Sequence, residues 1–219
     1  FPFVTFLTQH KEDQNLVTPY YNWLVRDWAI NRILIQRHKS RANLRLKSNQ
    51  ISKEVCVIGL GYIGLPTSII LARNSYRVIG VDINEKIVSS LNNGELTIDE
   101  DGLKEEFNLV LESSMFSAQT KPTHADIFLI TVPTPLKLIK DSIPQPDISY
   151  VISAIKSIAN YLKPGNLILI ESTCPVGTTH KVANMVLDLT SLVESQIHIA
   201  YCPERVIPGN ILNELYKND

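Results

Sequence analysis

Cysteine is scarce in this chain of 219 residues, which contains only Cys56, Cys174 and Cys202. Their number is odd and no two of them have CxxC spacing, so the chain alone supports neither a disulfide framework nor a thiolate zinc site. The histidines also lack the spacing of metal ligands; they are His10, His38, His124, His180 and His198. We therefore expect no metal and a reducing, cytoplasmic location.

An excess of charge of one sign is missing as well. The 21 Lys and Arg residues and 22 Asp and Glu residues give a net charge of -1, which argues against a nucleic-acid partner for the whole chain. Residues 1–50 differ from the rest, because their eight basic and three acidic side chains give +5 and leave −6 for the remainder. We interpret residues 1–50 as a basic N-terminal extension and linker, with a helix expected over Tyr20 to His38.

A long hydrophobic run occurs only once, from Val55 to Ala72, and glycines and a proline interrupt it. That pattern fits a strand, a turn and a helix better than a membrane span, so we expect no membrane partner. The chain begins with Phe1-Pro2-Phe3 and has neither an initiator methionine nor the basic segment of a signal peptide. We expect a fragment or a misread start.

From Ile51 onward, short apolar runs alternate with longer amphipathic ones. The expected strands are Glu54 to Ile58, Tyr76 to Asp82, Asp126 to Val132, Leu167 to Glu171 and Ile197 to Tyr201. The expected helices are Tyr62 to Asn74, Glu85 to Asn92, Asp101 to Leu111, Ile148 to Leu162 and Thr178 to Leu189, with Asn84 and Asp147 as N-caps. Apolar strands separated by helices predict an α/β fold, a Rossmann-like parallel sheet with helices on both faces over residues 51–209.

A G-x-G-x-x-G motif joins the first expected strand to the first expected helix. It consists of Gly59, Leu60, Gly61, Tyr62, Ile63 and Gly64 in that order. The first glycine permits a tight turn, the second allows a pyrophosphate to approach the backbone, and the third allows the helix to pack against the sheet. The amino end of the helix would then face the phosphates. The alternative is a glycine-rich turn without a ligand.

Asp82 ends the next expected strand, 18 positions after Gly64, where an adenosine ribose is expected. Its carboxylate can accept hydrogen bonds from both ribose hydroxyls and would repel a 2′-phosphate, so the sequence favours NAD over NADP. The alternatives are a solvated carboxylate and a helix cap.

Ligands of open parallel sheets bind beyond the carboxyl ends of the strands, and three such segments carry candidate residues. Thr134 follows one strand between two prolines, where the alternative is a rigid turn. Ser172 and Thr173 follow another, and either could hold a water or a carboxamide. Glu204 and Arg205 follow the last strand. Glu204 could act as a base or orient a water, and Arg205 could bind a phosphate or a carboxylate. The alternative is a surface ion pair between them.

Two residues near Thr173 have simpler interpretations. Thr178 could cap the following helix, and Cys174 could be a small packing residue. Cys174 has no histidine or lysine adjacent in sequence to lower its pKa, which argues against a nucleophile.

Together these segments resemble the N-terminal domain of the UDP-glucose and GDP-mannose dehydrogenase family. The motifs are Val57 to Pro66, Val81-Asp82, Val132 to Pro135, Glu171 to Thr178 and Tyr201 to Gly209, and the resemblance runs from about Lys53 to Asp219. Within the family, Pro146-Asp147, the Glu171 segment and Tyr201 to Val206 look most like UDP-N-acetyl-D-mannosamine dehydrogenases. UDP-N-acetylglucosamine and UDP-glucose 6-dehydrogenases stay as alternatives.

The resemblance implies a cytoplasmic enzyme of polysaccharide biosynthesis that oxidises C6 of a UDP-sugar to a carboxylate with two NAD in succession, through a cysteine thioester. It implies that Gly59, Gly61, Gly64 and Asp82 contact NAD, with Thr134 near the ribose or pyrophosphate. Thr173 and Glu204 would position water near the reacting carbon, and Arg205 would help to hold the substrate.

The sequence departs from the family in lacking the later lysine, asparagine and nucleophilic cysteine. In the family these follow a long central helix that also builds a homodimer, and residues 210–219 would only begin that connection. We therefore expect this chain to bind NAD without completing turnover. A non-catalytic NAD-binding module, with residues 1–50 docking on a partner or an anionic surface, is the competing hypothesis, and a solvated basic helix is the alternative for that segment.

Overall fold

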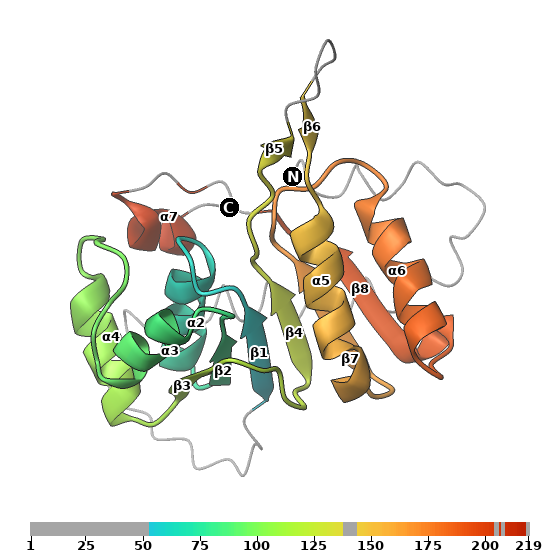
Figure 1. Ribbon diagram of the computed structural model, residues 1–219. Coiled ribbons are helices and arrows are strands. Elements are labelled where there is room, and N and C mark those ends of the chain that lie inside the picture. Colours follow the sequence, from blue (N-terminus) through green and yellow to red (C-terminus); the bar gives the residue numbers. More distant parts are fainter. Residues whose placement is uncertain (1–52, 138–143, 204–205, 207–208, 218–219) are drawn as a thin grey trace. The chain divides into compact units, whose positions relative to one another are not determined.

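A six-stranded parallel sheet forms the centre of the computed structural model, which describes residues 53–137, 144–203, 206 and 209–217 (Figure 1). Its strands lie in the order β3-β2-β1-β4-β7-β8, and every neighbouring pair is parallel. The bounds are β1 Glu54–Ile58, β2 Arg77–Val81, β3 Phe116–Gln119, β4 Ile127–Ile130, β7 Asn166–Ile170 and β8 Ile197–Tyr201. This order is that of a dinucleotide-binding sheet, whose switch point lies between β1 and β4, and it confirms the expected α/β fold.

Helices cover both faces of the sheet (Figure 1). They are α2 Gly64–Arg73, α3 Glu85–Asn92, α4 Leu103–Glu112, α5 Ser149–Ile158, α6 Thr178–Leu189 and α7 Ile211–Lys217. Short 3₁₀ turns span Ala159–Tyr161 and Glu194–Gln196, and a small hairpin pairs β5 Leu136–Lys137 with β6 Gln145–Pro146. None of the helices in the described part of the chain has the length and apolar character of a membrane span.

Alternate side chains of β1 enter two separate hydrophobic clusters. Val55 and Val57 pack with α2, α3 and α4 on one face, whereas Cys56 and Ile58 pack with α5 and α6 on the other. A strand that is buried on both faces gains from apolar residues at every position. This explains why the central strands appear in the sequence as continuous apolar runs.

The expected boundaries agree closely with the structure at several elements. The strands at Glu54–Ile58 and Ile197–Tyr201 and the helices at Glu85–Asn92 and Thr178–Leu189 have the expected bounds. The expected helix over Ile148 to Leu162 ends earlier, at Ile158, and a 3₁₀ turn follows it. The expected helix over Tyr20 to His38 lies outside the described residues.

The predicted helix caps have different outcomes. The Asn84 side chain accepts a hydrogen bond from the Lys86 N–H at 3.0 Å and caps α3, as predicted. Asp147 accepts from the Ser149 N–H at 2.9 Å at the start of α5, although Ile148 occupies the N-cap position. The interpretation of Thr178 as a cap is wrong, because its hydroxyl donates to the Pro175 carbonyl at 2.7 Å.

Candidate cofactor-binding site

The glycine motif forms the turn between β1 and α2, and its three glycines have different surroundings. Gly59 has φ +101°, and its N–H donates to the Val81 carbonyl at 2.8 Å. A Cβ on Gly64 would overlap the Gly59 carbonyl oxygen, whereas a Cβ on Gly61 would meet no atom within 4 Å. Gly59 and Gly64 are therefore needed by the fold itself, while Gly61 keeps an open space in front of the helix.

Thr131 fastens this turn to the neighbouring strand and is the site residue that the sequence did not single out. Its buried hydroxyl lies 2.7 Å from the Gly59 carbonyl oxygen and 3.0 Å from that of Ile58. Its N–H also donates to the Ile58 carbonyl at 2.9 Å. The only sequence signal was its position at the end of a predicted strand, which it shared with Val132 and Thr134.

The amino end of α2 carries no side-chain cap. Ile63 occupies the N-cap position, its side chain makes no capping hydrogen bond, and no acidic residue lies in the first turn. Gly61 and Tyr62 are exposed next to it. The positive end of the helix dipole favours an anion here, such as a pyrophosphate.

Asp82 lies at the carboxyl end of β2 and is tied to the glycine turn. Its Oδ2 accepts from the Leu60 N–H at 3.0 Å and its Oδ1 from the Asn84 N–H at 2.9 Å. A carboxylate oxygen can accept two hydrogen bonds, so each keeps capacity for a further donor. Since Asn84 is the cap of α3, the interpretation of Asp82 as that cap is wrong.

The remaining candidates in the segments that follow β4 and β7 differ in exposure and in hydrogen bonding. Thr134 is partly buried and Thr173 is exposed. The buried Ser172 hydroxyl donates to the Val132 carbonyl at 2.7 Å and so joins the two segments. This bond gives Ser172 a structural role. Glu204 and Arg205 lie outside the described residues.

Two of the cysteine thiols, those of Cys56 and Cys174, have raised pKa values. Burial raises the pKa of Cys56 to about 11, and a backbone hydrogen bond near Thr123 opposes this shift. Burial also raises the pKa of Cys174, and a hydrogen bond with Thr178 partly offsets it. Thiolates are the nucleophilic form, so neither thiol is activated. Among the described residues, no group of acids, histidines and cysteines could hold a metal ion.

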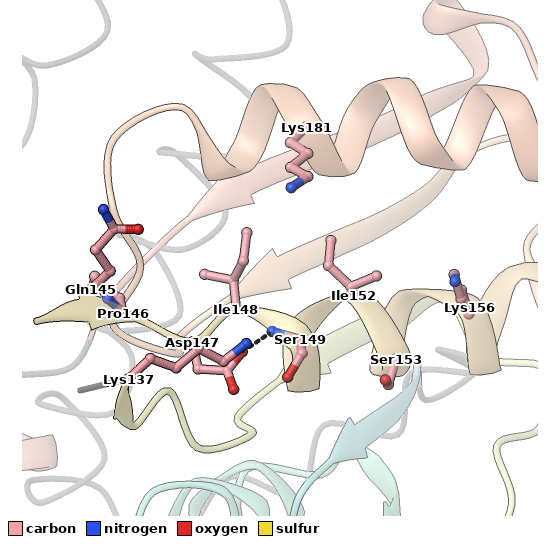
Figure 2. Close-up of a pocket in the computed structure, with 10 residues that line it drawn as sticks. All are labelled: Lys137, Gln145, Pro146, Asp147, Ile148, Ser149, Ile152, Ser153, Lys156 and Lys181. Carbon is pink, nitrogen blue, oxygen red and sulfur yellow. Dashed lines mark hydrogen bonds and ion pairs between the residues drawn. The ribbon is translucent and has the colours of Figure 1, made fainter. Parts of the chain in front are cut away.

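A groove of about 500 Å³ lies between α5, α6 and the base of the β5–β6 hairpin (Figure 2). Lys137 pairs with Asp147 in it at 3.0 Å, and hydrogen bonds from Ser149, followed by Lys137, lower the pKa of Asp147. No predicted site residue lines the groove. Its lining residues are Lys137, Gln145, Pro146, Asp147, Ile148, Ser149, Ile152, Ser153, Lys156 and Lys181.

Comparison with known proteins connects this geometry to a family. Residues 53–219 match the UDP-glucose/GDP-mannose dehydrogenase family, NAD binding domain. A UDP-N-acetyl-D-mannosamine dehydrogenase of Methanococcus maripaludis is 47% identical over 167 residues, which are 76% of this chain and 38% of that protein. One from Campylobacter jejuni is 46% identical over 179 residues, covering 78% of this chain and 43% of that protein.

Solved structures of UDP-N-acetyl-mannosamine dehydrogenases are also similar to this chain. The UDP-N-acetyl-mannosamine dehydrogenase Cap5O from Staphylococcus aureus has a TM-score of 0.70 and 42% identity, over 74% of this chain and 38% of that one. The Pyrococcus horikoshii UDP-D-ManNAc dehydrogenase has a TM-score of 0.69 and 38% identity over the same shares. The chain thus spans about two fifths of the length of these proteins.

Proposed function

This chain belongs to the UDP-glucose/GDP-mannose dehydrogenase family and contains its NAD-binding domain, and we propose that it is the cofactor-binding part of a UDP-N-acetyl-D-mannosamine 6-dehydrogenase. The substrate assignment rests on relatives of that name at 46–47% identity. In such an enzyme NAD accepts hydride from C6 of the sugar in each of two oxidations. UDP-N-acetylglucosamine and UDP-glucose are the alternative substrates.

The observation that carries this proposal is the cradle made by the glycine turn, α2 and Asp82. The open space at Gly61 accepts a pyrophosphate against the amino end of α2. The free acceptor capacity of the Asp82 carboxylate suits the two hydroxyls of the adenosine ribose. Thr131 holds the turn in place through its bond to the Gly59 carbonyl.

Asp82 also provides the preference for NAD over NADP. A 2′-phosphate at about 4 Å from the carboxylate would be repelled by about 4 kcal/mol per unit charge at an effective dielectric constant near 20. Asp82 already accepts backbone N–H groups on both oxygens, so it stays fixed at this position. We therefore assign NAD as the cofactor.

The remaining candidates are assigned from the family resemblance, because each follows an expected strand in the sequence. We assign Thr134 to binding the ribose or pyrophosphate of NAD. We assign Thr173 to contacting the cofactor and, together with Glu204, to positioning a water near the reacting carbon. We assign Arg205 to binding the sugar nucleotide. Neither Cys56 nor Cys174 suits the role of nucleophile, because the pKa of each is raised. That turnover needs residues outside the NAD-binding domain is supported by the extent of the match, because the chain spans only about two fifths of the length of its relatives.

Isothermal titration of the chain with NAD and NADP tests the proposal. Gly61→Val places a branched side chain in the cradle, and Asp82→Ala removes the ribose acceptor, so each is expected to weaken NAD binding at least tenfold while circular dichroism stays unchanged. Val193→Ala is the control, since this residue is 56% exposed and precedes β8, away from the carboxyl ends of the strands. Wild-type NAD affinity in both variants would contradict the proposal.

A further inference from the structure

The Tyr201 hydroxyl holds the backbone of a single residue in the segment that follows β7. Its oxygen accepts a hydrogen bond from the Cys174 N–H at 3.1 Å and donates to the Cys174 carbonyl at 3.4 Å. The phenol therefore uses its donor and an acceptor on the same residue, although its ring is partly exposed. This arrangement restrains the backbone orientation of Cys174.

Tyr201 reaches Cys174 because of the strand register. Tyr201 ends β8 and pairs with Ile170, the last residue of β7. The next N–H along, that of Cys202, donates to the Ile170 carbonyl at 2.9 Å. The chain that leaves β8 and the chain that leaves β7 are thus held together where both carry proposed site residues.

Thr173 lies between two anchored neighbours. On one side, the Ser172 hydroxyl bonds to the Val132 carbonyl at 2.7 Å; on the other, Tyr201 holds Cys174. Thr173 itself is exposed. The backbone at Thr173 is therefore fixed from both sides while its side chain remains accessible.

We propose that Tyr201 is a positioning residue that sets Thr173 for the nicotinamide half of the cofactor. The inference rests on the proposed function. Asp82 and the glycine turn take the adenosine side of the switch point, so the other half of the dinucleotide lies over the β4–β7–β8 side. Losing the Tyr201 hydroxyl frees the Cys174 backbone and lets Thr173 move.

The test compares NAD with ADP-ribose, which lacks the nicotinamide, by isothermal titration of the whole chain. Tyr201→Phe removes only the hydroxyl and is expected to weaken NAD binding by about 3- to 10-fold, with ADP-ribose affinity unchanged. Tyr150→Phe, which alters another exposed tyrosine on α5, is the matched control and is expected to bind both ligands like the wild type.

A double-mutant cycle shows whether Tyr201 acts through Thr173. Thr173→Val alone is expected to weaken NAD binding, and adding Tyr201→Phe to it is expected to cause little further loss. Fully additive losses, an unchanged NAD affinity in Tyr201→Phe, or an equal loss for NAD and ADP-ribose would each overturn the inference and leave the proposed function standing. A wild-type chain that binds neither ligand would instead overturn the proposed function, and the inference with it.

Discussion

At the scale of single residues, two glycines of the first turn have different roles: Gly64 is required by the packing of the fold, and Gly61 leaves space for a ligand. A Cβ at position 64 would overlap the Gly59 carbonyl and the Thr131 hydroxyl, while one at position 61 would enter open space. Gly64→Ala is therefore expected to lower the free energy of unfolding by about 1–3 kcal/mol through overpacking. Gly61→Ala is expected to change it by less than about 0.5 kcal/mol.

Urea denaturation of the two alanine variants checks this difference. They are matched because each adds one methyl group to the same turn, three residues apart in sequence. Gly61→Ala is also expected to weaken NAD binding, since its methyl group projects into the cradle. Equal stability losses in the two variants would contradict the assigned packing.

The sequence predicted Gly59, Gly61, Gly64 and Asp82 as cofactor contacts because their spacing reflects local backbone geometry. It did not reveal Thr131 or Tyr201. The Thr131 hydroxyl bonds to a carbonyl 72 positions away, and the Tyr201 hydroxyl bonds to a backbone 27 positions away. Such contacts depend on strand order and register, which no local pattern encodes.

At the scale of elements, the interior strands and the edge strand β8 were predictable, and the other edge strand, β3, was not. Interior strands are apolar along their length because both faces are buried. Phe116–Gln119 instead alternates buried and more exposed positions over only four residues, which is too short for a clear period-2 signal. The two-residue strands of the β5–β6 hairpin gave no signal for the same reason.

The outer edge of β3 is protected by a side chain. The Asn92 carboxamide donates to the Ala118 carbonyl at 2.8 Å and accepts from the Ala118 N–H at 3.0 Å. It thus replaces a neighbouring strand at one residue and satisfies backbone groups that an edge strand leaves unpaired. Asn92 comes from the end of α3, so it also fixes that helix to the sheet.

Asn92→Ala is expected to lower the free energy of unfolding by about 1–3 kcal/mol, because both Ala118 groups lose their partner while partly buried. Asn108→Ala, an exposed position on α4, is the control and is expected to change stability by less than about 0.5 kcal/mol. Chemical denaturation provides the measurement. An Asn92→Ala protein as stable as the control would mean that water replaces both bonds at no cost.

At the scale of the whole domain, Glu100 ties the C-terminal end of the described fold to a segment in the middle of the chain. Its buried carboxylate lies in the segment between α3 and α4 and accepts from the Gly209 N–H at 2.7 Å and 2.9 Å and from the Ile211 N–H at 3.4 Å. The segment before α7 is therefore tied to the adenosine-side half of the sheet, and α7 lies beside α2 (Figure 1).

Removing the Glu100 carboxylate tests whether this link holds α7. Glu100→Ala leaves the Gly209 and Ile211 N–H groups without their acceptor, at a cost of about 1–3 kcal/mol, so peptides covering residues 209–217 are expected to exchange amide hydrogens faster. Peptides covering β4 and β7 are expected to exchange as in the wild type, because the hydrophobic cluster that they form with α5 and α6 contains no residue of α7. Asp99→Ala, an exposed neighbouring acid, is the control. Wild-type exchange at residues 209–217 in Glu100→Ala would mean that the packing of α7, rather than this carboxylate, fixes the end of the domain.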